Sequence, residues 1–221
     1  MANVIKPGNF GTAVPADTKR VHFDFYNEQL IENGRKIDYL FIGDSITEHW
    51  NLRVYFKTDK YIENRGIGGD CSHYLLKRFD ADCIQLAPKC VILMIGTNDI
   101  LKTHDDLWWR TKGADEETVF SEYKDNVREM VKKCDAAGIE LIICSVPPST
   151  IAPPFDREKQ WRLTEKMNAF LKTLDKTYVD YHSVLTSDGK NIIPEYTMDG
   201  IHQTPAAYTA MANKLKEYIE L

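Results

Sequence analysis

The sequence contains few of the features expected of a nucleic-acid-binding or repetitive protein. It has no run of four or more basic residues, and its formal net charge is -5. A nucleic-acid binder usually presents a basic face, so this charge balance argues against one. No low-complexity segment and no internal repeat is visible, which argues against a disordered chain or a solenoid.

Long hydrophobic runs are also missing. No apolar stretch approaches the roughly 20 residues that a membrane-spanning helix needs. Residues 1–15 lack the basic and apolar regions of a signal peptide. We therefore expect a cytoplasmic protein without a membrane span.

Cysteine is present, but in neither a disulfide nor a zinc pattern. The five cysteines are an odd number and no C-x-x-C occurs, so both kinds of site are poorly supported. Cys90 and Cys144 lie in or beside apolar runs, which predicts buried thiols. Cys71 lies beside a glycine pair, and a catalytic role for it is a minor alternative.

Length and composition favour one ordinary domain. The chain has 221 residues, of which 43% are hydrophobic and 28% charged, enough for a packed core under a polar surface. We expect a single domain over residues 1–221, with residues 1–17 as an N-terminal extension.

Alternating apolar and helical segments predict an α/β fold. Wholly apolar runs at 39–42, 91–95 and 141–144 fit strands that are buried on both faces. Weaker strands are expected at 61–63 and 178–180. Helical spacing predicts helices at 21–30, with Asp17 or Thr18 as N-cap, and at 116–137, 161–174 and 205–219. Together they predict a three-layer α/β/α sandwich with a mostly parallel sheet.

Ser45 is the candidate nucleophile. It follows the strand at 39–42, and a strand-to-helix turn would present its hydroxyl at the carboxyl edge of the sheet, where α/β proteins bind ligands. Its own N–H would point toward an anion formed there. The alternative is that Ser45 only caps a helix.

A serine hydroxyl needs a base, and His202 is the best candidate of the six histidines. Asp199 stands three residues earlier in a turn of small residues, where a carboxylate can orient the imidazole. The alternative is an ordinary surface turn with an incidental histidine.

Gly69 and Asn98 complete the set as oxyanion donors. The pair Gly68-Gly69 allows backbone amides to approach a ligand closely. Asn98 offers a side-chain N–H just after a strand. A tight turn and a helix cap are the alternatives, and each is reasonable when its motif is taken alone.

Four motifs in this order make the chain resemble the SGNH, or GDSL-like, hydrolase family over about residues 39–208. The motifs are GDSITE at 43–48, NRGIGGD at 64–70, GTND at 96–99 and DGIH at 199–202. The chain has Ile46 where the family often has Leu, which is a conservative change.

The resemblance implies a flavodoxin-like sandwich without metal or organic cofactor. It implies a catalytic triad of Ser45, Asp199 and His202, with oxyanion donors at Ser45, Gly69 and Asn98. It implies ester hydrolysis through an acyl-serine, and a monomer or homodimer. The family accepts acetylated sugars, lysophospholipids, thioesters and simple esters, so the resemblance does not fix the substrate.

Other residues are candidates for shaping the substrate pocket. Trp108 and Trp109 could border it, or could instead pack in the core or in a subunit contact. Asp44 is a further substrate-binding candidate, although we expect Asp44 and Asp70 to hold their turns. The proline-rich segment at 145–154 is expected to border the cleft.

No long apolar lid is visible, which favours a small-molecule ester with a short acyl group, such as acetyl, on a carbohydrate or similar polar alcohol. The alternatives are a lysophospholipase or thioesterase with the same residues, and a catalytically silent binding protein.

Overall fold

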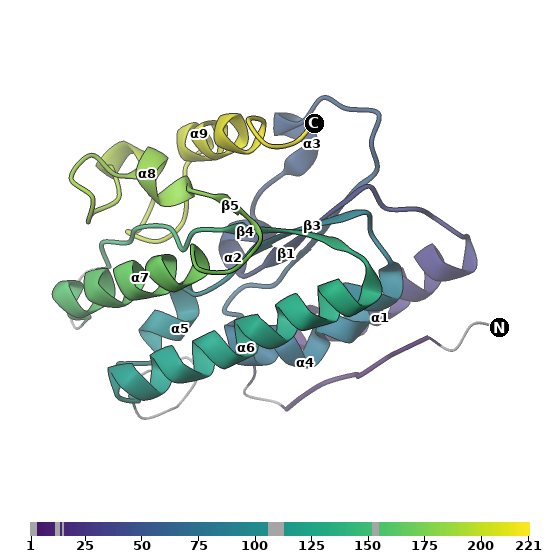
Figure 1. Ribbon diagram of the computed structural model, residues 1–221, viewed down its shortest axis with the longest axis horizontal. Helices are drawn as coiled ribbons and strands as arrows, with labels where there is room; N and C mark the ends of the chain where they lie inside the picture. The colour runs from purple at the N-terminus through teal and green to yellow at the C-terminus, as the bar shows by residue number, and fades with distance from the viewer. Residues whose placement is uncertain (1–3, 12–13, 15, 106–112, 152–154) are drawn as a thin grey trace.

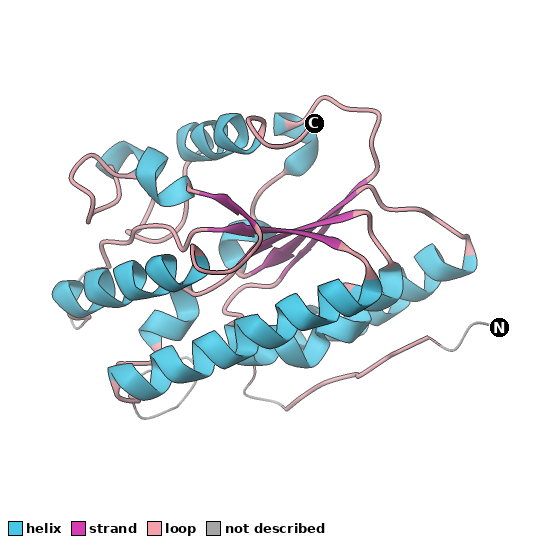
Figure 2. Ribbon diagram, viewed as in Figure 1, coloured by secondary structure: helices cyan, strands magenta, loops and turns pink. Residues whose placement is uncertain are grey.

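The computed structural model describes residues 4–11, 14, 16–105, 113–151 and 155–221. In these residues five parallel strands form one sheet in the order β2-β1-β3-β4-β5, with helices on both sides of it (Figure 2). The strands are β1 Tyr39–Gly43, β2 Ile62–Gly66, β3 Cys90–Met94, β4 Glu140–Cys144 and β5 Thr177–Val179. The prediction of a three-layer α/β/α sandwich with a parallel, flavodoxin-like sheet is confirmed.

The helices divide into two layers (Figure 1). On one face lie α1 Asp17–Glu32, α4 Ser72–Asp82, α6 Glu116–Ala137 and α7 Arg157–Leu171. On the other lie α3 Leu52–Tyr55, α8 Tyr181–Leu185 and α9 Pro205–Leu215. The short helices α2 Ser45–Glu48 and α5 Thr97–Leu101 directly follow strands β1 and β3.

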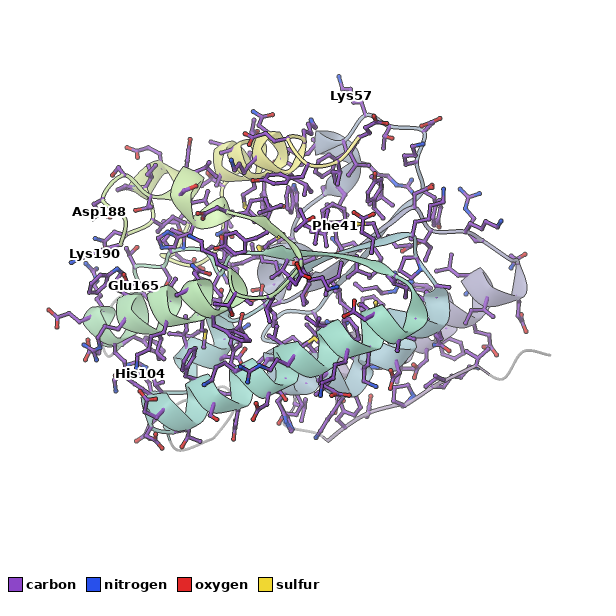
Figure 3. The ribbon with its side chains drawn as sticks, viewed as in Figure 1. Phe41, Lys57, His104, Glu165, Asp188 and Lys190 are labelled. Atoms are coloured by element: carbon purple, nitrogen blue, oxygen red, sulfur yellow. The ribbon has the colours of Figure 1, made fainter. Side chains whose placement is uncertain are left out.

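Successive side chains of a strand pack on opposite faces of the sheet, so the core consists of two hydrophobic clusters, one under each helix layer. Leu40 and Ile42 of β1 pack with the cluster that includes residues of α4, α6 and α7. Phe41 between them packs with the cluster that includes residues of α8 and α9, and lies in the middle of the molecule (Figure 3). Successive side chains of a strand point to opposite faces, so a strand covered on both faces is apolar throughout.

The strand order also fixes where a site can form. From β1 the chain moves to β2 on one side, then returns past β1 to β3 on the other. The carboxyl ends of β1 and β3 therefore flank the point where the order reverses, which is the usual ligand crevice of such sheets.

Predicted and observed elements agree best for long or wholly apolar segments. Helix α6 has the predicted bounds, and β1, β3 and β4 begin or end within a residue of the runs that predicted them. Strand β2 extends to Gly66, beyond the predicted end at 63, and β5 lies one residue earlier than predicted. Helix α7 begins at Arg157, because Asp156 caps it by accepting two backbone N–H groups, and α9 ends at Leu215.

Two expectations about helices were wrong or incomplete. Neither Asp17 nor Thr18 caps α1, because Ala16 occupies that position and Asp17 accepts the N–H groups of Phe10 and Gly11 instead. Helix α4 was not predicted. Its buried face includes Arg78 and Asp82, so it lacks the apolar period that reveals a helix.

Three further features concern the chain as a whole. None of the helices in the described residues has the length and apolar character needed to cross a bilayer. All five cysteines are free and buried, as expected for Cys90 and Cys144. The described residues of the N-terminal extension contact the domain, since Ile5 exchanges two hydrogen bonds with Gln85.

Candidate active site

Ser45 and Asn98 lie at the carboxyl ends of the neighbouring strands β1 and β3. Ser45 begins α2, two residues after the last residue of β1, and Asn98 lies in α5. The two strands approach closely here, since a Cβ on Gly43 would lie 2.1 Å from the Met94 carbonyl oxygen. Only glycine fits at position 43. Because the chain has glycine there, the turn that carries Ser45 can lie directly beside β3.

The structure brings the predicted triad together. His202 Nε2 lies 3.0 Å from Ser45 Oγ, and His202 Nδ1 lies 2.6 Å from Asp199 Oδ2. Ser45 itself is only 7% exposed. The hydroxyl, the imidazole and the carboxylate thus form one chain of hydrogen bonds, an arrangement that can activate a serine.

The turn that carries Asp199 and His202 is held by its own backbone. Asp199 Oδ1 accepts the N–H groups of Ile201 at 2.9 Å and His202 at 2.8 Å. Thr150, in the proline-rich segment after β4, donates its N–H to the Gly200 carbonyl at 2.8 Å. The segment expected to border the cleft therefore supports the triad turn.

The charge of Asp199 decides which imidazole nitrogen carries the proton. Partial burial raises the pKa of this carboxyl, but hydrogen bonds from the His202 backbone and ring outweigh it and keep the pKa below its ordinary value. An ionised Asp199 accepts the Nδ1 proton, because a carboxylate has no proton to donate. Nε2 is then free to accept the proton of Ser45.

Three N–H groups at this edge of the sheet are the predicted oxyanion donors. Within the described chain, the N–H groups of Ser45 and Gly69 have no hydrogen-bond acceptor. Gly69 has a φ of +77°, a conformation that glycine adopts without strain. Asn98 Nδ2 donates one hydrogen to the Asp70 carbonyl at 2.8 Å, which leaves its second hydrogen available. These groups can bind an oxyanion.

A buried arginine links the nucleophile turn to the glycine loop. Arg78 Nε donates to Asp70 Oδ2 at 2.7 Å, and Arg78 Nη2 donates to the Gly43 carbonyl at 3.0 Å. Burial raises the pKa of Asp70 to about 6, although Arg78 opposes the shift. Arg78 also bonds Asp82, which Arg20 contacts in turn. The sequence analysis did not predict this network. The one local signal for it was that Arg78 and Asp82 stand four residues apart, a spacing that allows an ion pair on one face of a helix.

The third motif is fixed to helix α4. Asp99 accepts the N–H of Ser72 at 2.9 Å and its hydroxyl at 2.6 Å. Tyr123 of α6 donates its hydroxyl to the Ile95 carbonyl at 3.0 Å. Asn98 therefore stands in a short helix, α5, whose position α4 and α6 fix through these hydrogen bonds.

The remaining residues that the sequence analysis considered for substrate binding or catalysis are not supported in those roles or lie outside the described residues. Asp44 is 2% exposed and its carboxylate caps α2 by accepting the Ile46 N–H, so it presents almost no surface to a substrate. Burial raises the pKa of Cys71 to about 12, which keeps this thiol neutral and unreactive. Trp108 and Trp109 lie outside the described residues.

Two neighbours of the site were not singled out from the sequence. The ring centroid of the exposed His49 lies 5.3 Å from that of His202. Glu48 contacts the glycine loop through the N–H of Gly68. Both follow Ser45 within one turn of helix, and that spacing was the signal available.

Within the described residues, His, Cys, Asp and Glu side chains form no group of three that could hold a metal ion.

Comparison with known proteins finds similar folds. A GDSL-like lipase from Bacteroides thetaiotaomicron VPI-5482 shares 29% identity and a TM-score of 0.70, over 91% of this chain and 96% of its own. An acetylxylan esterase from Geobacillus stearothermophilus, crystallised as a catalytic mutant, has the same fold at 20% identity and a TM-score of 0.63, over 83% and 93%.

A curated relative is longer than this chain. It is the N-acylneuraminate cytidylyltransferase of Escherichia coli O18:K1:H7 (strain RS218 / NMEC), 26% identical over 201 residues. The match covers 88% of this chain but only 43% of that enzyme, so the chain spans less than half the length of this relative.

The sequence also matches the GDSL-like Lipase/Acylhydrolase family over residues 41–210, a range that contains all four motifs and every triad residue. The chain belongs to this family of hydrolases that act on esters.

Proposed function

We propose that the chain is a serine esterase that works through an acyl-serine intermediate. The observation that carries the proposal is the 3.0 Å contact of His202 Nε2 with Ser45 Oγ, together with the 2.6 Å contact of His202 Nδ1 with Asp199. Geometry of this kind allows one imidazole to act as base and then as acid.

In the first half-reaction Ser45 Oγ attacks the ester carbonyl carbon while its proton moves to His202 Nε2. The oxyanion receives hydrogen bonds from the N–H groups of Ser45 and Gly69 and from Asn98 Nδ2. The intermediate then collapses, the C–O bond to the alcohol breaks, and His202 returns the proton to the leaving oxygen.

The second half-reaction repeats these steps with water. His202 takes a proton from water, the hydroxide attacks the acyl-Ser45 carbonyl, and the same donors stabilise the second oxyanion. Collapse releases the carboxylic acid and returns the proton to Ser45 Oγ. Each proton taken is given back, so no other reactant is needed.

The preferred substrate is an ester of a short acyl group, especially acetyl, with a carbohydrate or similar polar alcohol. Support comes from an open groove of about 590 Å³ beside the turn that carries Asp199 and His202; Asp199 and Gly200 line this groove, whereas Ser45 and His202 do not. Its polar side chains include Thr150, Asp188 and Asn191, and the loop carrying Asp188 is visible after α8 (Figure 3). The groove combines these with the exposed side chain of Met198, a mixture that suits a polar alcohol better than a lipid chain.

The acetylxylan esterase supports the same preference, since in that protein this fold acts on an acetyl ester of a carbohydrate. A long acyl chain would require a large apolar channel. The alternative is a lysophospholipase or thioesterase with the same catalytic residues, and a series of substrates distinguishes it from an acetylesterase.

The decisive experiment is Ser45→Ala with the exposed Ser121→Ala of α6 as matched control. Ser45→Ala should lower kcat roughly 10⁴-fold or more, as in other triad enzymes, and abolish labelling by a fluorophosphonate probe. The control should keep both. Near-normal turnover in Ser45→Ala would refute the mechanism, and a wild-type protein that neither labels nor turns over esters would indicate a silent binding protein.

A second assay addresses the substrate. p-Nitrophenyl esters of increasing acyl length should give the highest kcat/KM at acetate, and acetylated sugars should outperform lysophospholipids and acyl thioesters. A maximum at long acyl chains would overturn the acetyl preference while leaving the serine mechanism intact.

A further inference from the structure

The glycine loop presents two consecutive backbone N–H groups beside the nucleophile, and they are used differently. Gly68 donates its N–H to Glu48 Oε2. The N–H of Gly69 has no acceptor among the described residues. A Cβ on Gly68 would lie 3.7 Å from Ser45 Cβ, so the loop is in contact range of the nucleophile. Only one of the two amides is therefore available to an oxyanion.

Glu48 and Ser45 are the last and first residues of the same short helix, α2. The Glu48 N–H bonds the Asp44 carbonyl at 2.9 Å. Strand β2 ends directly against this point, since a Cβ on Gly66 would lie 2.2 Å from the Glu48 nitrogen. The backbone that carries the carboxylate is thus fixed relative to both the nucleophile and the glycine loop.

The second carboxylate oxygen is held from a different element. Lys19 Nζ, in the first turns of α1, lies 2.5 Å from Glu48 Oε1. The side chains of Lys19 and Glu48 are 39% and 19% exposed. Lys19 lies outside residues 41–210 that match the family, so a residue outside the matched segment contacts one that supports the site.

The pairing of Glu48 with Lys19 is electrostatically favourable for the site. A carboxylate near the serine would repel a developing oxyanion if its charge were unopposed. Here the charge is opposed by Lys19 and by the Gly68 N–H. Hydrogen bonds to an ionised acceptor are about twice as strong as neutral ones, so Glu48 can restrain a loop that two glycines would otherwise leave flexible.

We infer that Glu48, held by Lys19, is a positioning residue for the oxyanion site, which orients the Gly68-Gly69 segment so that the Gly69 N–H points to the developing charge. It touches the Gly68 amide and none of the reacting atoms. This inference rests on the proposed serine esterase mechanism, and it assigns to the sixth residue of the first motif a role that the triad geometry does not explain.

The test compares Glu48→Ala with the conservative Glu48→Gln, and uses Glu129→Ala of α6, whose side chain is half-exposed, as control. Hydrolysis of p-nitrophenyl acetate is measured for each. Glu48→Ala should lower kcat about 10²-fold with KM little changed, since displacing a group of the catalytic geometry by about 1 Å has effects of this size. Glu48→Gln still offers an oxygen to Gly68 and should stay within about tenfold of the wild type.

Backbone amide spectra provide a readout that is independent of turnover. The ¹H resonance of Gly68 should move upfield in Glu48→Gln, because a neutral acceptor replaces a charged one. Lys19→Met should lower kcat less than Glu48→Ala does. If Glu48→Ala does not fold, the kcat of Glu48→Gln and its Gly68 resonance test the inference without it.

Three results would overturn the inference: a Glu48→Ala enzyme with normal kcat or a defect in KM alone, a Gly68 resonance unmoved in Glu48→Gln, or a loss beyond about tenfold in that variant. Failure of the proposed function would look different. In that case the wild-type protein would lack turnover and probe labelling, whereas here the wild type is active and only the Glu48 variants depart from expectation.

Discussion

Replacing Asp199 by Asn tests the triad through the position of a single proton. The Asn carbonyl oxygen can still accept the N–H groups of Ile201 and His202, which Asp199 Oδ1 accepts at 2.9 and 2.8 Å. The turn should therefore fold normally. The amide nitrogen then faces His202 Nδ1 as a donor, so Nδ1 must accept and Nε2 must carry the proton. An imidazole in that tautomer cannot take the proton of Ser45.

The size of the effect depends on how exposed the pair is. In enzymes with a buried triad carboxylate the same change lowers kcat about 10⁴-fold. Here the side chains of Asp199 and His202 are 50% and 27% exposed, so water can partly solvate the imidazolium. We expect a smaller loss, about 10²- to 10³-fold, equivalent to roughly 3–4 kcal/mol of transition-state stabilisation.

The assay is the steady-state hydrolysis of p-nitrophenyl acetate, with circular dichroism and Tm to verify folding. Asp115→Asn is the matched control, because Asp115 caps α6 by accepting the Thr118 N–H at 2.9 Å and Asn can serve the same role. The control should keep its kcat. An Asp199→Asn enzyme that is folded and within about threefold of wild-type kcat would refute the orienting role of this carboxylate.

Three further predictions concern the residues around the triad. Asn98→Ala should lower kcat about 10²- to 10³-fold at similar KM, as for a lost oxyanion donor; a change confined to KM would contradict this role. Arg78→Met should reduce the free energy of unfolding by about 3–5 kcal/mol in urea titrations, because it leaves the fully buried carboxylate of Asp70 without its cation; a loss under about 1 kcal/mol would contradict that estimate. Burial, with the charges of Asp70 and Asp99, raises the pKa of Asp44 from its ordinary 3.8 to about 7. The folded state thus holds this proton more tightly than the unfolded state, so the contribution of Asp44 to the free energy of unfolding falls as pH rises from about 4 to about 7 and is constant above that range. Asp44→Asn keeps the acceptor for Ile46 and removes the titration, so its stability relative to wild type should be greater at pH 8 than at pH 5, and an equal difference at both would count against the shift.

Much of the architecture could be predicted because local patterns and tertiary packing agree. Strands β1, β3 and β4 are buried on both faces, so their apolar runs are unbroken and easily recognised. Helix α6 combines an N-cap at Asp115, an apolar stripe and Gly138 in the left-handed conformation at its end. Each of these signals acts within a few residues, so the sequence displays them directly.

The sequence was least informative where buried faces are polar. In α1 the apolar Val21 and Phe25 are 44% and 57% exposed, while Arg20 and Asn27 are fully buried. An apolar period therefore indicates the wrong face of that helix. The buried residues are stable there only because partners from α4 and β2 satisfy them, as when Asn27 bonds Asp82 and Arg65. No local pattern in α1 predicts hydrogen-bond partners that are more than 35 residues away in the chain.

The sequence by itself determined the layered fold, the family and the chemical groups of the site, because strand burial, helix caps and short motifs depend on residues close together in the chain. Only the tertiary structure decided how these groups meet. It places Nε2 of His202 3.0 Å from the hydroxyl of Ser45 across 157 positions. It also pairs Glu48 with the Gly68 amide, while the Gly69 amide has no acceptor in the part of the chain that the structure describes. The physical reason is that hydrogen bonds and ion pairs act over a few ångströms. Which groups come within that range is set by the packing of the whole domain and not by their neighbours in sequence.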